Sequence, residues 1–184
     1  MSSEPERIIR NHVLWAMGAG LLPIPLVDFA AVTAVQLDML KDLAAHYGVN
    51  YDRSSGKAFV SALTGTTFAS IGASIVKAIP GLGSVLGGVS MSLMSGASTY
   101  AVGQVVRQAY ATSGSLDGLD LSVARKAYED AFERGKAYVS DLQQEKDKAT
   151  QIFEALERLE KLKQDGLLTE EEFQAKKQEL FNRF

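Results

Sequence analysis

The chain has 184 residues, no cysteine and a net charge of −3, and 46% of its residues are hydrophobic. These values allow one domain with a small appendage and a buried core, and the lack of cysteine excludes disulfides, thiol nucleophiles and thiolate metal sites. Residues 1–110 carry seven Lys or Arg against six Asp or Glu, and residues 111–184 carry twelve against sixteen, so neither half has the basic surface typical of nucleic-acid binding.

Two helices are predicted before residue 50. The first covers residues 6–22 and ends before Pro23, because a residue that precedes proline is disfavoured in the α region. The second runs to about Tyr47 and ends at Gly48, since glycine commonly follows a helix C-terminus. The apolar stretch 13–22 has no clear cleavage site, so we interpret it as part of the folded protein and not as a signal peptide.

Residues 58–106 contain only one charged side chain, Lys77. This pattern predicts two uncharged helical arms, 58–76 and 81–106, joined by a Pro-Gly turn. The turn residues are Lys77, Pro80, Gly81 and Gly83. Both arms are long enough, or nearly so, to cross the hydrocarbon core of a bilayer, although their many serines, threonines, glycines and alanines contribute little to membrane insertion.

Small residues recur at every fourth position of each arm, and this spacing places them on one helix face. They are Ser61, Gly65, Ala69 and Ala73 in the first arm and Ser84, Gly88, Ser92 and Gly96 in the second. A stripe of small side chains lets two helix backbones approach closely. We therefore predict that these residues form the packing face of the hairpin; the alternative is that small residues are simply frequent here.

The remaining sequence predicts a helical C-terminal part. Residues 112–121 form a Gly/Ser/Asp-rich linker after the first domain, 1–111, and residues 122–151 form a charged stalk with an interrupted heptad pattern. Residues 152–184 predict a short helical hairpin, in which Thr169 and Glu172 form a capping box. This hairpin is too small to be very stable alone, so we expect its apolar residues to promote self-association. They are Leu156, Leu159, Leu162, Leu168, Phe173 and Leu180.

Several motifs occur in order within residues 13–110. They are Ile24-Pro25-Leu26-Val27-Asp28, Gln36-Leu37-Asp38-Met39-Leu40, Leu43-Ala44-Ala45-His46-Tyr47-Gly48, Ile79-Pro80-Gly81-Leu82-Gly83 and Thr99-Tyr100-Ala101-Val102-Gly103. Together they resemble the YcjF-like domain of unknown function, which occurs in bacterial inner-membrane proteins and behind GTPase domains. The resemblance implies a helical domain with a membrane-embedded hairpin and no known reaction. Because no GTPase sequence precedes the motifs in this chain, we expect any GTPase to be a separately encoded partner.

A second resemblance covers residues 159–181. The sequence from Leu162 to Phe173, which contains Asp165-Gly166 and Thr169-Glu170-Glu171-Glu172, resembles the short C-terminal (SHOCT) domain. That domain is often appended to membrane-associated or oligomeric bacterial proteins. The resemblance implies oligomerisation and not catalysis.

The sequence predicts no catalytic, cofactor-binding or metal-binding site. The Gly-Lys pairs at 56–57 and 135–136 lack the upstream glycine and the hydroxyl residue of a phosphate loop. The two histidines are His12 and His46, and Asp42 near His46 does not complete the three or four ligands of a zinc site. Since no nucleophile is paired with a base, we expect no enzymatic activity.

These observations predict an all-α, non-enzymatic scaffold that self-assembles, contacts membrane lipid and binds no nucleic acid. We place it on the cytoplasmic side of a bacterial inner membrane, because Arg53, Lys57 and Arg107 flank the open end of the hairpin. Two other interpretations fit the same residues. One is a soluble cytoplasmic homo-oligomer with the hairpin buried between subunits, and the other is a pore-forming hairpin protein.

Overall fold

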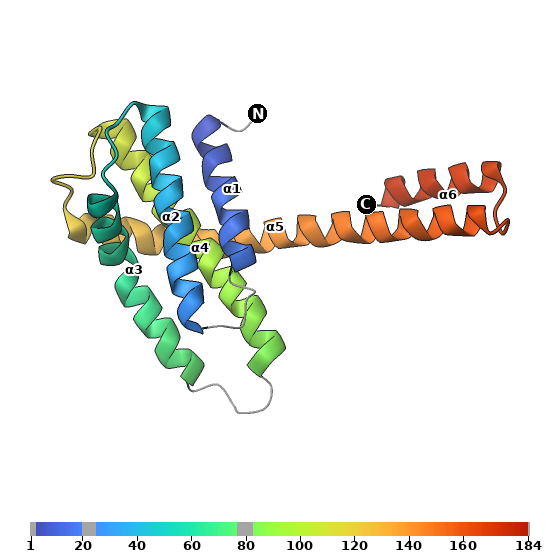
Figure 1. Ribbon diagram of the computed structural model, residues 1–184, viewed down its shortest axis with the longest axis horizontal. Coiled ribbons are helices and arrows are strands. Elements are labelled where there is room, and N and C mark those ends of the chain that lie inside the picture. Colours follow the sequence, from blue (N-terminus) through green and yellow to red (C-terminus); the bar gives the residue numbers. More distant parts are fainter. Residues whose placement is uncertain (1–2, 20–24, 77–82, 184) are drawn as a thin grey trace. The chain divides into compact units, whose positions relative to one another are not determined.

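The computed structural model describes the backbone of residues 3–19, 25–76 and 83–183, and the side chains of residues 3–18, 30–65 and 91–180. Over these residues the secondary structure is entirely helical, which confirms the all-α prediction. The helices are α1 (Glu4–Ala19), α2 (Pro25–Tyr47), α3 (Arg53–Val76), α4 (Gly83–Thr112), α5 (Leu121–Gln164) and α6 (Glu170–Arg183) (Figure 1). They belong to two compact units, Met1–Val139 (unit 1) and Ser140–Phe184 (unit 2).

The ends of the first helices follow local sequence signals. Within the described residues α1 ends at Ala19, whereas the prediction extended to residue 22. The predicted end of α2 is confirmed, because the helix stops at Tyr47 and Gly48 has a φ of 67°. Glycine adopts this left-handed conformation without a Cβ clash, and the amide of Val49 then donates to the carbonyl of Ala44 at 2.8 Å.

The core of unit 1 forms where α1, α2 and α4 pack against one another (Figure 1). On α1 the buried side chains Ile9, Val13 and Ala16 are spaced by four and three residues, the period of a helix face. The facing surfaces combine large residues of α2 with small and β-branched residues of α4. These residues are Val32, Met39, Leu40 and Leu43 on α2 and Ala97, Ala101, Val102 and Val106 on α4.

Helices α3 and α4 are the two arms predicted from the charge-free segment, and α3 also contacts α2. Among residues 3–19, 25–76 and 83–183, no helix combines the length and the hydropathy needed to cross a bilayer. A membrane-length apolar hairpin is therefore not shown over these residues. The predicted turn residues Lys77, Pro80 and Gly81 lie outside the described backbone.

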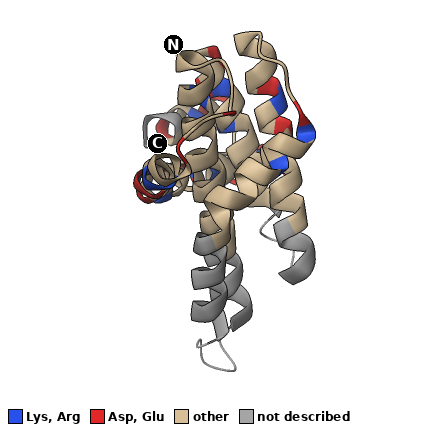
Figure 2. Cartoon of the chain, turned by 90° about the vertical axis from the view of Figure 1, so that its left-hand side faces the viewer, with Lys and Arg blue, Asp and Glu red and all other residues tan. Residues whose placement is uncertain are grey.

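Residues 113–120 connect α4 to α5, and α5 then continues through both the predicted stalk and the first helix of the C-terminal hairpin. Asp120 caps α5, because its Oδ1 accepts hydrogen bonds from the amide of Ser122 at 2.8 Å and from that of Val123 at 3.4 Å. The side-chain and backbone hydrogen bonds from Ser122 lower the pKa of Asp120. Figure 2 shows that most of the described ribbon of α1 to α4 carries no charged residue, whereas α5 and α6 carry Lys and Arg together with Asp and Glu.

Candidate functional site

Two of the predicted small residues lie in the interior of unit 1. The Oγ of Ser92 donates a hydrogen bond to the carbonyl of Met17 on α1 at 2.8 Å. A Cβ atom added at Gly96 would lie 2.8 Å from Cγ of Met17 and 2.9 Å from Cγ2 of Val139, which is closer than real Cβ atoms approach. Ser92 and Gly96 therefore allow α4 to lie close to α1 and to α5.

The other predicted packing residues are either exposed or outside the described side chains. Ser61 and Gly65 on α3 are exposed, and no described atom lies within 4 Å of a Cβ added at Gly65. The surroundings of Ala69, Ala73, Ser84 and Gly88, and of the turn residue Gly83, lie outside the described part of the structure. Packing of one arm against the other through the stripes stays a prediction.

Two glycines that the stripe pattern did not include also permit close helix contacts. A Cβ added at Gly135 on α5 would lie 2.9 Å from the carbonyl oxygen and 3.1 Å from Cα of Ala97 on α4. A Cβ added at Gly103 would lie 2.9 Å from Cγ1 of Ile9. The signal available in the sequence was the seven-residue spacing of Gly96 and Gly103, which places both on one face of α4.

A buried polar cluster connects α2, α4 and α5 in unit 1. The Nε2 of Gln36 donates to Oγ of Ser98 at 3.1 Å and lies 3.4 Å from Oγ1 of Thr99, and the hydroxyl of Tyr128 donates to Oγ of Ser98 at 3.0 Å. All of these side chains are buried. Among the described atoms Oε1 of Gln36 has no hydrogen-bond partner. Because buried polar groups are costly unless paired, this cluster fixes the relative register of the three helices.

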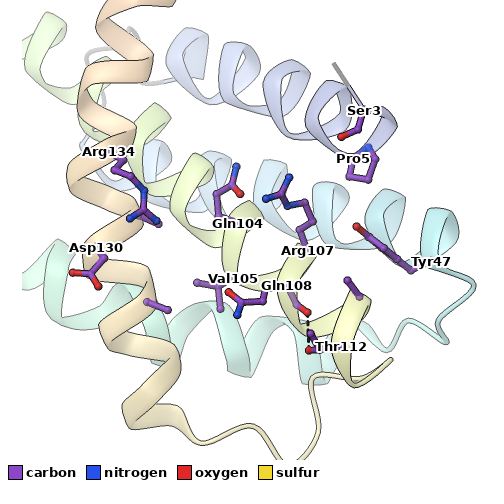
Figure 3. Close-up of a pocket in the computed structure, with 13 residues that line it drawn as sticks. Ser3, Pro5, Tyr47, Gln104, Val105, Arg107, Gln108, Thr112, Asp130 and Arg134 are labelled. Atoms are coloured by element: carbon purple, nitrogen blue, oxygen red, sulfur yellow. Dashed lines mark hydrogen bonds between the residues drawn. The ribbon is translucent and has the colours of Figure 1, made fainter. Parts of the chain in front are cut away.

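An open pocket of about 640 Å³ lies between the N-terminus of α1, the C-terminal half of α4 and the first part of α5. Figure 3 shows Arg134 on α5 across from Gln104 and Arg107 on α4. Arg107 Nη1 lies 3.5 Å from Oε1 of Glu6. Hydrogen bonds from Ser3 lower the pKa of Glu6, and Arg107 lowers it further. No histidine or cysteine belongs to the described lining, so this pocket presents no such nucleophile or base.

Among the described residues, His12, Asp38 and Asp42 form the one group of three His or acidic side chains whose ligand atoms lie within 4.8 Å of one another. The Nε2 of His12 on α1 lies 3.6 Å from Oδ2 of Asp38 and 3.7 Å from Oδ2 of Asp42, both on α2. The sequence interpretation considered Asp42 together with His46 and did not include His12. The only sequence signal was the i, i+4 spacing of the two aspartates, because His12 joins them through the packing of α1 on α2.

The C-terminal hairpin of unit 2 is confirmed in its local geometry. The amide of Thr169 donates to Oε2 of Glu172 at 2.9 Å, and the amide of Glu172 donates to Oγ1 of Thr169 at 3.2 Å, which is the predicted capping box. The hydrogen bonds from Thr169 lower the pKa of Glu172. Lys163 on α5 connects the two helices, because its Nζ pairs with Glu170 and lies 4.9 Å from the ring centre of Phe173.

The apolar residues of the C-terminal hairpin, from Phe153 onward, are only partly covered within one chain. Leu162 is 39% exposed, and two other large apolar residues of the same unit, Phe153 and Leu167, are 73% and 69% exposed. The remaining predicted association residues are half-buried, namely Leu156, Leu159, Leu168, Phe173 and Leu180. Their incomplete burial is compatible with contacts to a further helix, and self-association stays a prediction.

Comparisons with known proteins show similarity along most of the chain. Residues 4–115 match the family described as "Domain of unknown function (DUF697)", and residues 154–180 match the short C-terminal domain, SHOCT. The SHOCT expectation is thus confirmed, whereas the DUF697 match supports the YcjF-like resemblance only loosely. The protein named magnetosome membrane protein 22, from Magnetospirillum gryphiswaldense (strain DSM 6361 / JCM 21280 / NBRC 15271 / MSR-1), is 35% identical over 149 residues, which are 78% of this chain and 76% of that relative. No solved structure matches the chain significantly.

Proposed function

The chain belongs to the DUF697 family and ends in a SHOCT domain, and from this premise we propose that it is a non-enzymatic, membrane-associated scaffold that self-assembles. The observation that carries the proposal is the segment 58–106, in which Lys77 is the only charged residue. A segment of this length without further charge avoids the cost of burying ionised groups in lipid. The name of the relative, a magnetosome membrane protein, also supports membrane association.

In this proposal the hairpin extends from a fixed base inside unit 1. The base is the interior contact at Ser92 and Gly96 and the buried cluster around Gln36 and Ser98. These groups hold α4 against α1 and α2. The part of segment 58–106 that lies beyond them can therefore contact a membrane while the core stays folded. We place the protein at the cytoplasmic face of a bacterial inner membrane.

An exposed tryptophan on α1 adds to this proposal. Trp15 is 71% exposed and its neighbour Leu14 is 37% exposed, which is a high exposure for two adjacent large apolar residues. Tryptophan is enriched at membrane–water interfaces, because its ring is apolar and its N–H needs a polar partner. We propose that Trp15 contacts the interfacial region of the bilayer.

Self-association is proposed for unit 2. Its half-buried leucines and Phe173 lie on α5 and α6, and Lys163 of α5 connects the two helices through Glu170 and Phe173. A hairpin of this size buries too little apolar surface to be very stable by itself, and a second copy supplies the missing contacts. A separately encoded GTPase is the proposed further partner.

The experiment that tests membrane association is flotation of the full-length protein with vesicles of phosphatidylethanolamine and phosphatidylglycerol. We expect the wild-type protein to float with the vesicles. The Gly88→Glu variant introduces a charge into segment 58–106 and should remain in the soluble fraction, because a charged residue at the bilayer centre costs about 3 kcal/mol. The control Ala137→Glu adds the same charge at an exposed position of α5 and should float.

A soluble homo-oligomer is the second candidate. It is favoured by the finding that no helix over the described residues is apolar enough to cross a bilayer. A wild-type protein that stays wholly in the soluble fraction and forms a discrete particle by light scattering would replace the membrane proposal with this one.

A further inference from the structure

His12 is held in a fixed orientation at the contact of α1 with α2. The residue is only 9% exposed. Its Nδ1 lies 2.9 Å from the carbonyl oxygen of Ile8. A carbonyl oxygen only accepts hydrogen bonds, so the proton of this bond is on Nδ1. In the neutral ring Nε2 then carries the free lone pair, and it is Nε2 that faces Asp38 and Asp42.

The distances from Nε2 do not describe direct hydrogen bonds. They are 3.6 Å to Asp38 and 3.7 Å to Asp42, whereas N–H···O hydrogen bonds are about 2.7–3.2 Å long. Ligand atoms that share one tetrahedral ion at bonds of about 2.1 Å are separated by about 3.4 Å. The three ligand atoms of the cluster all lie within 4.8 Å of one another. The aspartate side chains are 59% and 48% exposed, so small rotations bring the oxygens to that separation.

The charges of the cluster also favour a cation. Asp38 and Asp42 are four residues apart on one helix, and like charges at this spacing repel each other. Among the described residues, neither carboxylate pairs with a lysine or an arginine. A divalent ion neutralises both carboxylates and accepts the lone pair of His12.

We propose that His12, Asp38 and Asp42 bind a divalent transition-metal ion of the class that accepts mixed nitrogen and oxygen ligands, such as Zn²⁺ or Mn²⁺. The imidazole ligand disfavours Mg²⁺ and Ca²⁺, which prefer oxygen alone. The hydrogen bond from Nδ1 to Ile8 supplies the outer contact that orients a metal-binding histidine. Water occupies the remaining coordination positions on the exposed side of the aspartates.

A metal ion bound by His12, Asp38 and Asp42 links α1 to α2. The ligands come from helices that contribute Ile9, Val13, Met39 and Leu43 to the core of unit 1. An ion that binds the folded protein and not the unfolded chain raises the free energy of unfolding. The metal therefore stabilises the packing of α1 on α2, and this role is independent of membrane binding or self-association.

The test is titration of the metal-free full-length protein with ZnCl₂, followed by calorimetry and by the change in Tm. We expect one Zn²⁺ per chain, a higher Tm with Zn²⁺ and no comparable effect of MgCl₂. The Asp38→Asn/Asp42→Asn variant keeps the shape of both exposed side chains. Its Zn²⁺ affinity should fall by at least roughly 10- to 100-fold, which is the loss produced when only the hydrogen-bond partners of metal ligands are changed.

The control is His46→Gln, which removes the other histidine four residues after Asp42 and should leave Zn²⁺ affinity unchanged. His12→Gln should abolish the Tm increase. If that variant does not fold, nuclear magnetic resonance of the wild-type imidazoles decides, since Zn²⁺ should shift Nε2 of His12 and leave His46 unchanged. Equal Zn²⁺ affinity of the wild type and the double aspartate variant, or loss of binding in His46→Gln, would overturn the proposal.

Discussion

Single glycines decide how closely the helices of unit 1 approach. Gly96 and Gly135 occupy places where an added Cβ would come within 3.0 Å of a neighbouring helix, whereas Gly65 has no described atom within 4 Å. At Gly135 the neighbour is the backbone of Ala97, which cannot rotate away as a flexible side chain does. Glycine thus has a packing role in α4 and α5. The described atoms show no such role for the exposed Gly65.

We expect Gly135→Ala to destabilise the full-length protein in urea unfolding followed by circular dichroism. Alanine improves helix propensity by up to about 1 kcal/mol, but overpacking costs about 1–3 kcal/mol and requires α5 to move away from Ala97. The control Gly65→Ala should raise the free energy of unfolding by about 0.5–1 kcal/mol, because it gains propensity without a described neighbour. Equal stability of the two variants would contradict the assigned role of Gly135.

At the scale of elements, α6 depends on its own N-terminal cap. The capping box of Thr169 and Glu172 is formed by exposed groups that are close in sequence, so it needs no contact from the rest of the molecule. Gly166, with a φ of 74°, ends α5 by the corresponding C-terminal signal. The C-terminal hairpin was therefore predictable in detail from its turn sequence.

Replacing Thr169 with alanine should destabilise α6 by about 1 kcal/mol, a typical cost for the loss of an N-cap. Hydrogen exchange of the full-length protein should show faster exchange at the amides of α6 and little change in α1, α2 and α4. Thr150→Ala is a matched control, because Thr150 lies inside α5 and donates to the carbonyl of Lys146 at 3.0 Å. That change should be neutral or slightly stabilising. Unchanged exchange in α6 of the Thr169 variant would show that the capping box does not support this helix.

At the scale of the whole molecule, the two units differ in how their apolar residues are covered. Unit 1 has fully buried residues such as Val13, Leu40 and Val102, whereas the described leucines of unit 2 from Leu156 onward are half-buried or exposed. An element with an incompletely covered apolar face gains stability from a further partner. Self-association is therefore assigned to unit 2 in the proposed function.

The variant Leu156→Glu/Leu162→Glu should lower the sedimentation coefficient of the detergent-free full-length protein, because it places two charges on the proposed contact face. Circular dichroism should confirm that the helix content is retained. The control Val123→Glu changes an apolar residue that is 65% exposed in the first turn of α5, and it should sediment as the wild type does. An unchanged sedimentation coefficient in the double leucine variant would contradict self-association through unit 2.

The sequence by itself determined the helical class, the end of α2 at Gly48, the capping box at Thr169 and the SHOCT domain, because each of these depends on residues close together in the chain. The contacts of Ser92, Gly96 and Gly135, the cluster around Gln36 and the approach of His12 to Asp38 and Asp42 were decided by tertiary structure. A four-residue repeat identifies a helix face but not the helix that it meets. That choice depends on how α1, α2, α4 and α5 fill one core, and it brings together residues that are far apart in the sequence.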